Sequence, residues 1–293
     1  MAIMYADVHI HIALNRYFSI KSWNEMSDEN RDRMLKKIFA EYRQLGITTL
    51  RDGGDNAFVS YHARRLAMAE GIVYKSPVYA IYKRGCYGSF LGKPVSDLNE
   101  IKKELVELSS YEPDHIKIVV TGLVDFQKYG EVGGVNFTFK ELSYISDFAK
   151  ERGLPLMVHA NGKEGVSLAL KAGISTLEHG YLVSEAELYG MAEAGITWVP
   201  TLSPLGNILE FGNSKFEKSR DIIQKVFNKQ LENIRIADAL GVKISLGSDA
   251  GAYLVGHGNG LFDEMRHFES IGCFSRSKIE SMCRGVLLLS KKN

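Results

Sequence analysis

The chain has 293 residues, of which 45% are hydrophobic and 24% are charged, and this composition excludes an intrinsically disordered protein. The 36 basic and 35 acidic side chains leave a formal charge of +1, which excludes the strong field that gathers nucleic acid or anionic lipid. We therefore expect a small-molecule substrate, with no nucleic acid and no membrane as partner.

The three cysteines, Cys86, Cys273 and Cys283, are an odd number at wide spacing, which fits neither a disulfide framework nor a Cys-x-x-Cys zinc site. No stretch is long and apolar enough to cross a bilayer. The N-terminal segment also lacks the basic region and cleavage site of a signal peptide. These features predict a cytoplasmic protein.

Short β-branched runs alternate with longer segments of helical periodicity about eight times along the chain. Several of the helix-like segments end in glycine, the residue that a helix C-cap favours. Eight uninterrupted strand–helix units predict an α/β fold of the (β/α)8 TIM-barrel type, which typically takes about 250 residues. The predicted strands cover residues 3–10, 47–52, 77–82, 115–122, 154–160, 174–180, 196–201 and 242–249.

One barrel accounts for the whole chain, because no linker, low-complexity segment or charge block marks a second domain. We therefore predict a single domain over residues 1–293. Segments 261–272 and 275–290 supply the final helices that close it. The alternative is an open doubly wound sheet, but no Gly-x-Gly-x-x-Gly follows the first predicted strand to support a dinucleotide fold.

Polar side chains gather where the predicted strands end, and a TIM barrel carries its functional groups at that edge. His9 and His11 end the first strand. His159 and His179 end the fifth and sixth strands, and Asp249 ends the eighth. Four of the eight histidines thus fall at the same end of the barrel, although strand ends are a small part of the chain. This distribution predicts one shared site.

Side chains two apart in a strand share a face. We therefore expect Asp7, His9 and His11 to point into the barrel. Val8 and Ile10 alternate with them and are expected to pack against the helices.

Lys117 lies within the fourth predicted strand, on a face that points into the barrel. An unpaired charge there costs several kcal/mol or more. One explanation is an ion pair with a carboxylate such as Asp7 or Asp249. The other is that burial lowers the pKa of the amine, which then reacts with carbon dioxide and becomes an anionic two-oxygen ligand able to bridge two cations.

Neutral imidazoles and carboxylate oxygens are the ligand set of zinc and similar divalent ions. Four histidines, one aspartate and a carboxylated Lys117 would hold two metals, about 3.5–4 Å apart in hydrolytic sites. We therefore expect two divalent metal ions as cofactors, with zinc as the first candidate.

The motifs DVHIH, IKIVVTG, LMVHANG, STLEHG and LGSDAG carry these residues, together with GITTLRDGG, LKAGISTLEHG and GITWVPTL. In this order and at these intervals they resemble the amidohydrolase superfamily of metal-dependent barrel hydrolases, over nearly the whole chain. The strand-four lysine and the segment TGLVDFQKYGEVGG look most similar to the branch that contains imidazolonepropionase-like enzymes and prolidase-like dipeptidases.

The resemblance implies a role for each ligand. The more buried metal would be held by His9, His11 and Asp249. The more exposed one would be held by His159 and His179, with the carboxylated lysine as the bridge. Water activated by the metals would attack a carbonyl, and Asp249 would take its proton and deliver it to the leaving nitrogen. That chemistry is hydrolysis of an amide or peptide-like C–N bond, as in a dipeptide, an N-acyl amino acid or a cyclic amide.

Two features depart from the family pattern. Many members carry a small β-sandwich built from both chain ends, whereas the first predicted strand starts almost at Met1 and few residues follow Asp249. We therefore expect the barrel to lack that domain, and the surface it would cover to be exposed or used in a homo-oligomer. The motif HANG also has Asn161 where relatives often have a further histidine.

Two other functions remain open. A nucleobase deaminase would use the same histidines and aspartate around one metal, but it usually carries a glutamate soon after the strand-five histidine, and none precedes Glu164. Lys117 also favours two metals. A metal-binding or ligand-sensing protein without turnover is the other possibility, which the presence of Asp249 beside all the other ligands disfavours.

Loop residues supply the candidate substrate contacts. The segment KRGCYGSF after the third strand offers Arg84 and Tyr87, which could hold a carboxylate. Tyr181 follows EHG at the mouth of the sixth strand, and His257 in LVGHGNGLFDE resembles a substrate-facing loop position of relatives. The alternative reading of these residues is solvated loop charge and packing aromatics.

Overall fold

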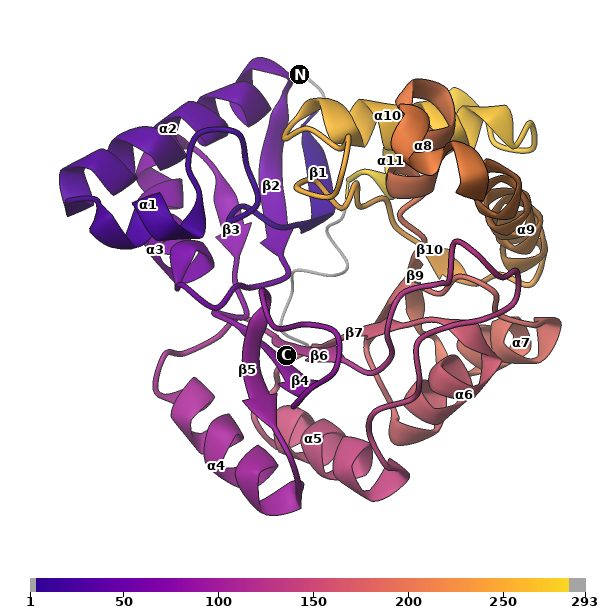
Figure 1. Ribbon diagram of the computed structural model, residues 1–293, viewed down its shortest axis with the longest axis horizontal. Coiled ribbons are helices and arrows are strands. Elements are labelled where there is room, and N and C mark those ends of the chain that lie inside the picture. Colours follow the sequence, from indigo (N-terminus) through magenta and orange to yellow (C-terminus); the bar gives the residue numbers. More distant parts are fainter. Residues whose placement is uncertain (1–3, 285–293) are drawn as a thin grey trace.

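The computed structural model describes residues 4–284, in which strands and helices alternate and the helices form an outer ring around the strands (Figure 1). The strands are β1 Tyr5–Ile10, β2 Ile47–Asp52, β3 Val73–Lys75, β4 Ala80–Lys83, β5 Gly92–Val95, β6 Ile116–Val119, β7 Leu156–Ala160, β8 Thr176–His179, β9 Thr197–Val199 and β10 Lys243–Ile244. The α-helices are α1 Ile20–Glu25, α2 Asp28–Gln44, α3 Val59–Ala67, α4 Leu98–Ser109, α5 Phe139–Glu151, α6 Gly162–Ala172, α7 Glu185–Ala194, α8 Ser203–Phe211, α9 Arg220–Ala239, α10 Asn259–Ser270 and α11 Arg276–Met282, with 3₁₀ turns η1 Met68–Glu70 and η2 Ser214–Ser219.

The strands pair in parallel, in the orders β1-β2-β3 and β10-β9-β8-β7-β6-β4-β5. Backbone contacts join these two sheets at both seams. At one seam Ile10 pairs in parallel with Ala250, just beyond β10. At the other, the Asp55 amide donates to the Val78 carbonyl at 3.4 Å. The sheet therefore closes, and the predicted (β/α)8 barrel is confirmed.

Eight of the ten strands within residues 4–284 correspond to the predicted ones, and the sequence patterns do not predict β3 and β5. The last strand is shorter than expected, because β10 ends at Ile244 and Asp249 lies on the loop that follows. The final predicted helix, 275–290, is seen as α11, and its part beyond residue 284 lies outside the described residues. The predicted domain 1–293 likewise extends beyond the described range at both ends.

The outer faces of the strands and the inner faces of the helices build the main core. In β6, Ile116 and Ile118 belong to this core, whereas Lys117 and Val119 do not. That alternation is the one predicted for the strand. Within residues 4–284 no helix is both long enough and apolar enough to span a bilayer.

Helix ends are defined by local side-chain caps. At the start of α5 the Thr138 side chain accepts from the Glu141 amide at 3.3 Å, while the Glu141 carboxylate accepts from the Thr138 amide at 2.8 Å. This reciprocal pair satisfies donors that the first turn of a helix leaves free. Ser27 caps α2 in the simpler way, by accepting from the Asn30 amide.

Strand β1 departs from simple alternation. Its register with β2 shifts between Asp7 and Ile10, as at a β-bulge. Val8 packs with Ala6 and Val199 in a small cluster apart from the helix-packed core. The prediction that Val8 packs against the helices is therefore wrong, whereas Ile10 lies in the helix-packed core as expected.

The same shift turns Asp7 away from the barrel axis. Its carboxylate accepts from the Ser248 amide at 2.9 Å and from the Ser248 hydroxyl at 2.5 Å. The Ser248 side chain in turn lies against Gly260 of α10, on the helical side of the sheet. The prediction that Asp7 shares the inward face of His9 is wrong, because the bulge between them reverses the alternation.

Helix α4 provides a direct test of the core. Leu105 is fully buried and its neighbour Val106 is 65% exposed. We expect Leu105→Ala to lower the free energy of unfolding by about 2–5 kcal/mol, because it leaves a cavity. The matched change Val106→Ala should alter it by about 0.5 kcal/mol or less. Denaturant unfolding of both variants measures this, and equal effects would contradict the packing described for α4.

Candidate metal centre

Six polar side chains converge at the mouth of the barrel where the strands end. They come from five separate parts of the wall: β1 and the residue after it, β6, β7, β8, and the loop after β10. Five of them line a cavity of about 270 Å³, and His9 lies buried beside them. The six are His9, His11, Lys117, His159, His179 and Asp249.

Three of these residues offer ligand atoms that lie within 4.8 Å of one another. His9 Nε2 lies 3.3 Å from His11 Nε2. The Asp249 Oδ1 atom lies 3.6 Å from the first nitrogen and 3.5 Å from the second. Two imidazole nitrogens and a carboxylate oxygen in this arrangement fit a divalent cation such as zinc.

The other three residues complete the same cluster. The His179 ring centre lies 4.9 Å from that of His9 and 4.6 Å from that of His159. Lys117 is 1% exposed, and within residues 4–284 its ammonium nitrogen has no hydrogen-bond partner. The structure therefore does not contain the ion pair of Lys117 with Asp7 or Asp249 that the sequence left open.

Burial controls the charge of these groups. It lowers the pKa of His11 and of His159 to about 3, with the nearby Lys117 acting in the same direction. It also lowers the pKa of Lys117 itself to about 8. The imidazoles are thus neutral, the form that binds metal, and the lysine has a substantial fraction of nucleophilic free amine near neutral pH.

Hydrogen bonds to the far side of two rings fix which nitrogen faces the site. His9 Nδ1 donates to Glu178 Oε2 at 2.6 Å. His179 Nδ1 donates to the Thr201 hydroxyl at 2.7 Å, and that hydroxyl donates onward to the Pro200 carbonyl at 2.8 Å. Both rings therefore turn the lone pair of Nε2 toward the cluster, as ligating histidines require.

A buried ion pair holds Glu178 in place. Arg51 Nη2 lies 2.8 Å from Glu178 Oε1, and both side chains are almost completely buried. The Arg51 guanidinium also donates to the Val8 carbonyl at 2.6 Å and to the Thr176 hydroxyl at 3.0 Å. Sequence reasoning missed this pair. The available signal was an arginine in ITTLRD and a glutamate in STLEHG, both inside predicted strands.

The backbone is strained at two of the ligand positions. His179 has φ of 64° and Asp249 has φ of 59°, values that non-glycine residues rarely adopt. The His179 carbonyl accepts from Trp198 Nε1 at 2.9 Å and from Gln230 Nε2 at 2.7 Å. The Asp249 amide donates to the His9 carbonyl at 2.8 Å. These contacts hold both residues in conformations that regular strands do not provide.

Gly53, in the predicted motif GITTLRDGG, makes room for His11. A Cβ atom on Gly53 would lie 2.2 Å from Cε1 of the His11 ring, which is much closer than real Cβ contacts allow. The second residue of the His-x-His pair therefore depends on a glycine at the end of the neighbouring strand.

Two of the four candidate substrate contacts lie at the cavity. Tyr87 and Tyr181 line it, and the Tyr181 hydroxyl donates to the Thr201 carbonyl at 2.6 Å. Arg84 does not line it: its guanidinium is bound to Ser96 and Glu100, and its side chain is 58% exposed.

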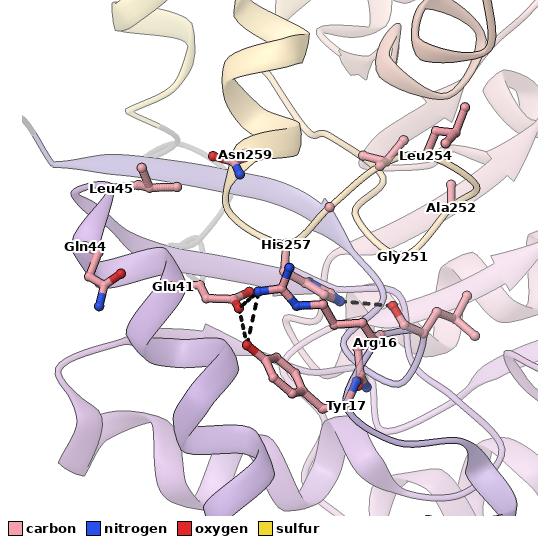
Figure 2. A pocket seen from close by; sticks show the side chains of 14 residues that line it. Arg16, Tyr17, Glu41, Gln44, Leu45, Gly251, Ala252, Leu254, His257 and Asn259 are labelled. Atoms are coloured by element: carbon pink, nitrogen blue, oxygen red, sulfur yellow. Dashed lines mark hydrogen bonds and ion pairs between the residues drawn. The ribbon is translucent and has the colours of Figure 1, made fainter. Parts of the chain in front are cut away.

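His257 lies at a second cavity of about 700 Å³, which shares Leu14 and Ala252 with the first (Figure 2). Both of its ring nitrogens are occupied, since Nε2 donates to the Leu14 carbonyl at 3.0 Å and Nδ1 accepts from the Tyr42 hydroxyl at 2.9 Å. His257 thus ties the loop after β1 to α2.

The larger cavity does not gather metal ligands. Figure 2 shows Arg16, Tyr17 and Glu41 turned toward one another there, with the carboxylate shared between the guanidinium and the hydroxyl. These side chains form their hydrogen bonds with one another at the surface. The donor set therefore places the candidate site in the smaller cavity.

The chain belongs to the amidohydrolase family, whose profile matches residues 4–276. It is 30% identical over 235 residues to ochratoxinase from Aspergillus niger. That alignment covers 73% of this chain and 48% of the relative, so the chain spans about half the length of the curated relative it matches.

Solved structures share the fold. A Xaa-Pro dipeptidase with methionine bound in its active site aligns with a TM-score of 0.73 at 24% identity, covering 95% of this chain and 73% of the other. The A. niger ochratoxinase structure aligns with a TM-score of 0.78 at 19% identity, covering 99% and 72%. The fold and the family that the sequence motifs indicated are thereby confirmed.

The contact between Glu178 and His9 can be tested on the metal itself. We expect Glu178→Gln to weaken metal binding about 10–100-fold, because the neutral amide no longer fixes the tautomer of His9. Equilibrium dialysis over a range of metal concentrations measures the dissociation constant of the metal. Glu185→Gln, on the exposed surface of α7, is the matched control and should bind metal like the parent protein. Unchanged affinity in Glu178→Gln would remove the positioning role.

Proposed function

We propose that this protein hydrolyses an amide or peptide-like C–N bond of a small molecule at a centre of two divalent metal ions. Zinc is the first candidate for these ions. The observation that carries the proposal is the convergence of six potential ligands at one cavity. Hydrogen bonds orient the ring nitrogens of His9 and His179, and within residues 4–284 the Lys117 amine has no hydrogen-bond partner. Membership of a generally metal-dependent family supports it. So do the hydrolase names of ochratoxinase and the Xaa-Pro dipeptidase.

In this proposal the metals supply Lewis acidity, which lowers the pKa of water and polarises a carbonyl. His9, His11 and Asp249, the donors that lie within 4.8 Å of one another, would hold one metal. His159 and His179 would hold the other.

Lys117 joins the two halves of the cluster after carboxylation. Its free amine attacks the carbon of carbon dioxide, a C–N bond forms at Nζ, and one proton is released to solvent. The product is an anionic carbamate with two oxygens. Burial of Nζ favours this reaction, since it lowers the pKa of the amine to about 8 and thereby raises the fraction of free amine near neutral pH.

Asp249 moves the proton. Its carboxylate faces the cavity beside the imidazoles of His9 and His11, and its backbone is held in place by the His9 carbonyl. It accepts a proton from the attacking water and transfers that proton to the leaving nitrogen, so that the departing group is a neutral amine.

Deamination is the less favoured chemistry. A deaminase needs an acid close to the strand-five histidine, and Asn161 occupies the nearby position, with its amide nitrogen 3.3 Å from His159 Nε2. Glu164 lies exposed on α6 and does not line the cavity. A metal content near one equivalent, together with release of ammonia from cytosine or aminopurines, would favour deamination instead.

Asp249→Asn tests the proton transfer. We expect the variant to fold and to keep much of its metal, because the amide oxygen still faces the site. Its turnover of any amide that the parent protein cleaves should fall at least about 100-fold, as expected for loss of a general acid–base. Steady-state kinetics with metal analysis of the same sample measure both. An active Asn variant would exclude Asp249 from this role.

Lys117→Ala tests the bridge. The parent protein should contain about two equivalents of divalent metal by elemental analysis. The variant should lose metal, and a short carboxylic acid should restore part of it by supplying the missing oxygens. Lys163→Ala, an exposed position on α6, is the control and should keep the parent metal content. Full metal occupancy in Lys117→Ala without added acid would contradict the bridging role.

A further inference from the structure

The side chains that wall the metal cavity indicate which amides fit it, and this inference rests on the proposed hydrolysis. We propose that the substrate is a small amide whose groups on both sides of the scissile bond are apolar or aromatic and uncharged. Dipeptides and N-acyl amino acids, which carry an α-carboxylate, belong to the disfavoured class.

Aromatic rings from separate loops form the outer wall. Phe126 follows β6, Phe216 lies on η2 and Tyr253 follows β10. The Phe216 ring centre lies 6.3 Å from that of Phe126 and 5.2 Å from that of Tyr253, so the three rings pack as one surface. Burial of apolar substrate area against such a surface is favourable.

The inner wall is also apolar. Leu205 and Ile208 of α8 line one part of it. Tyr87 lines another, with its ring centre 5.6 Å from that of Phe90 and 5.5 Å from that of His159. At about 270 Å³ the space is near the small end of ligand cavities, which run from about 300 to 1,000 Å³, so a substrate must contact these walls closely.

Two polar side chains of the wall, Asn161 and Tyr181, are engaged within the protein. The Asn161 amide donates to the Gly122 carbonyl at 3.2 Å and accepts from the Tyr181 amide at 3.0 Å. The Tyr181 hydroxyl donates to Thr201. These groups hold loops together, which leaves few of them to solvate a charged substrate group.

Cations that could hold a carboxylate lie elsewhere. Apart from the candidate ligand Lys117, the cavity-lining residues of the described chain include no lysine or arginine. Arg84 is paired with Glu100. Lys215 is exposed at the rim, where its ammonium lies 5.4 Å from the ring centres of Phe216 and Tyr253.

A charged group beside the scissile bond would thus leave water without gaining a counter-charge from the wall. Such transfer is costly, whereas a neutral aromatic group gains contact area at no such cost. Selectivity against carboxylates therefore follows from what the wall lacks as well as from what it contains.

Matched probes test this on the full metal-loaded chain. N-acetyl-2-phenylethylamine is neutral, N-acetyl-L-phenylalanine adds only a carboxylate, and glycyl-L-phenylalanine carries both charges. We expect kcat/KM for the neutral amide to exceed each of the other two by about tenfold or more. Equal or reversed preference would overturn the inference while leaving the hydrolase proposal intact.

Calorimetric binding of the same compounds separates the two proposals. If no amide is cleaved, the proposed function fails, and tighter binding of the neutral compound would still support the apolar substrate class. Tighter binding of either charged compound would overturn that class.

Two variants examine the wall directly. Leu123 lines the cavity and is 49% exposed, so a polar side chain can be placed there without burying it. Leu123→Lys should reduce the preference for the neutral amide several-fold, and the matched Leu123→Gln should not. Lys215→Ala should leave the preference unchanged. A selective loss of activity on N-acetyl-L-phenylalanine in Lys215→Ala would show that the rim lysine recognises carboxylates and would overturn the inference.

Discussion

The ion pair between Arg51 and Glu178 is the contact on which the candidate site depends. Both side chains lie inside the barrel, where each charge requires the other, because removal of one partner leaves an unpaired buried charge. The pair also connects three strands, since Arg51 reaches the backbone of Val8 and Glu178 reaches the ring of His9. The Arg51–Glu178 ion pair, which does not itself line the cavity, thus determines which nitrogen of His9 faces the candidate metal site.

Exclusion of water from the barrel interior sets the protonation states of the histidines and of Lys117. The histidines are neutral and the lysine is partly deprotonated for one reason, the cost of charging a group that has lost its hydration. The strained backbone at His179 and Asp249 completes the arrangement, and hydrogen bonds from Trp198 and Gln230 stabilise it at His179.

The strands and the loops contribute different properties. The candidate ligands Lys117, His159 and His179 stand on strands that are paired on both sides, whereas Asp249 stands on the loop after β10. The rings of Phe126, Phe216 and Tyr253 stand on separate connecting segments, so that they can differ among relatives that share the barrel. Asn161 belongs to neither group. Its side-chain amide joins the loops after β6 and β8.

The sequence by itself determined the barrel and which candidate ligands in regular strands face inward, because alternation along a strand is a local property that Lys117 and His159 obey. It could not determine the face of Asp7, since the bulge in β1 depends on pairing with β2. It could not place Glu178 against Arg51, which lie 127 residues apart. Nor could it show that His179 and Asp249 turn inward through left-handed backbone, because only the packed tertiary structure stabilises conformations that the local chain disfavours.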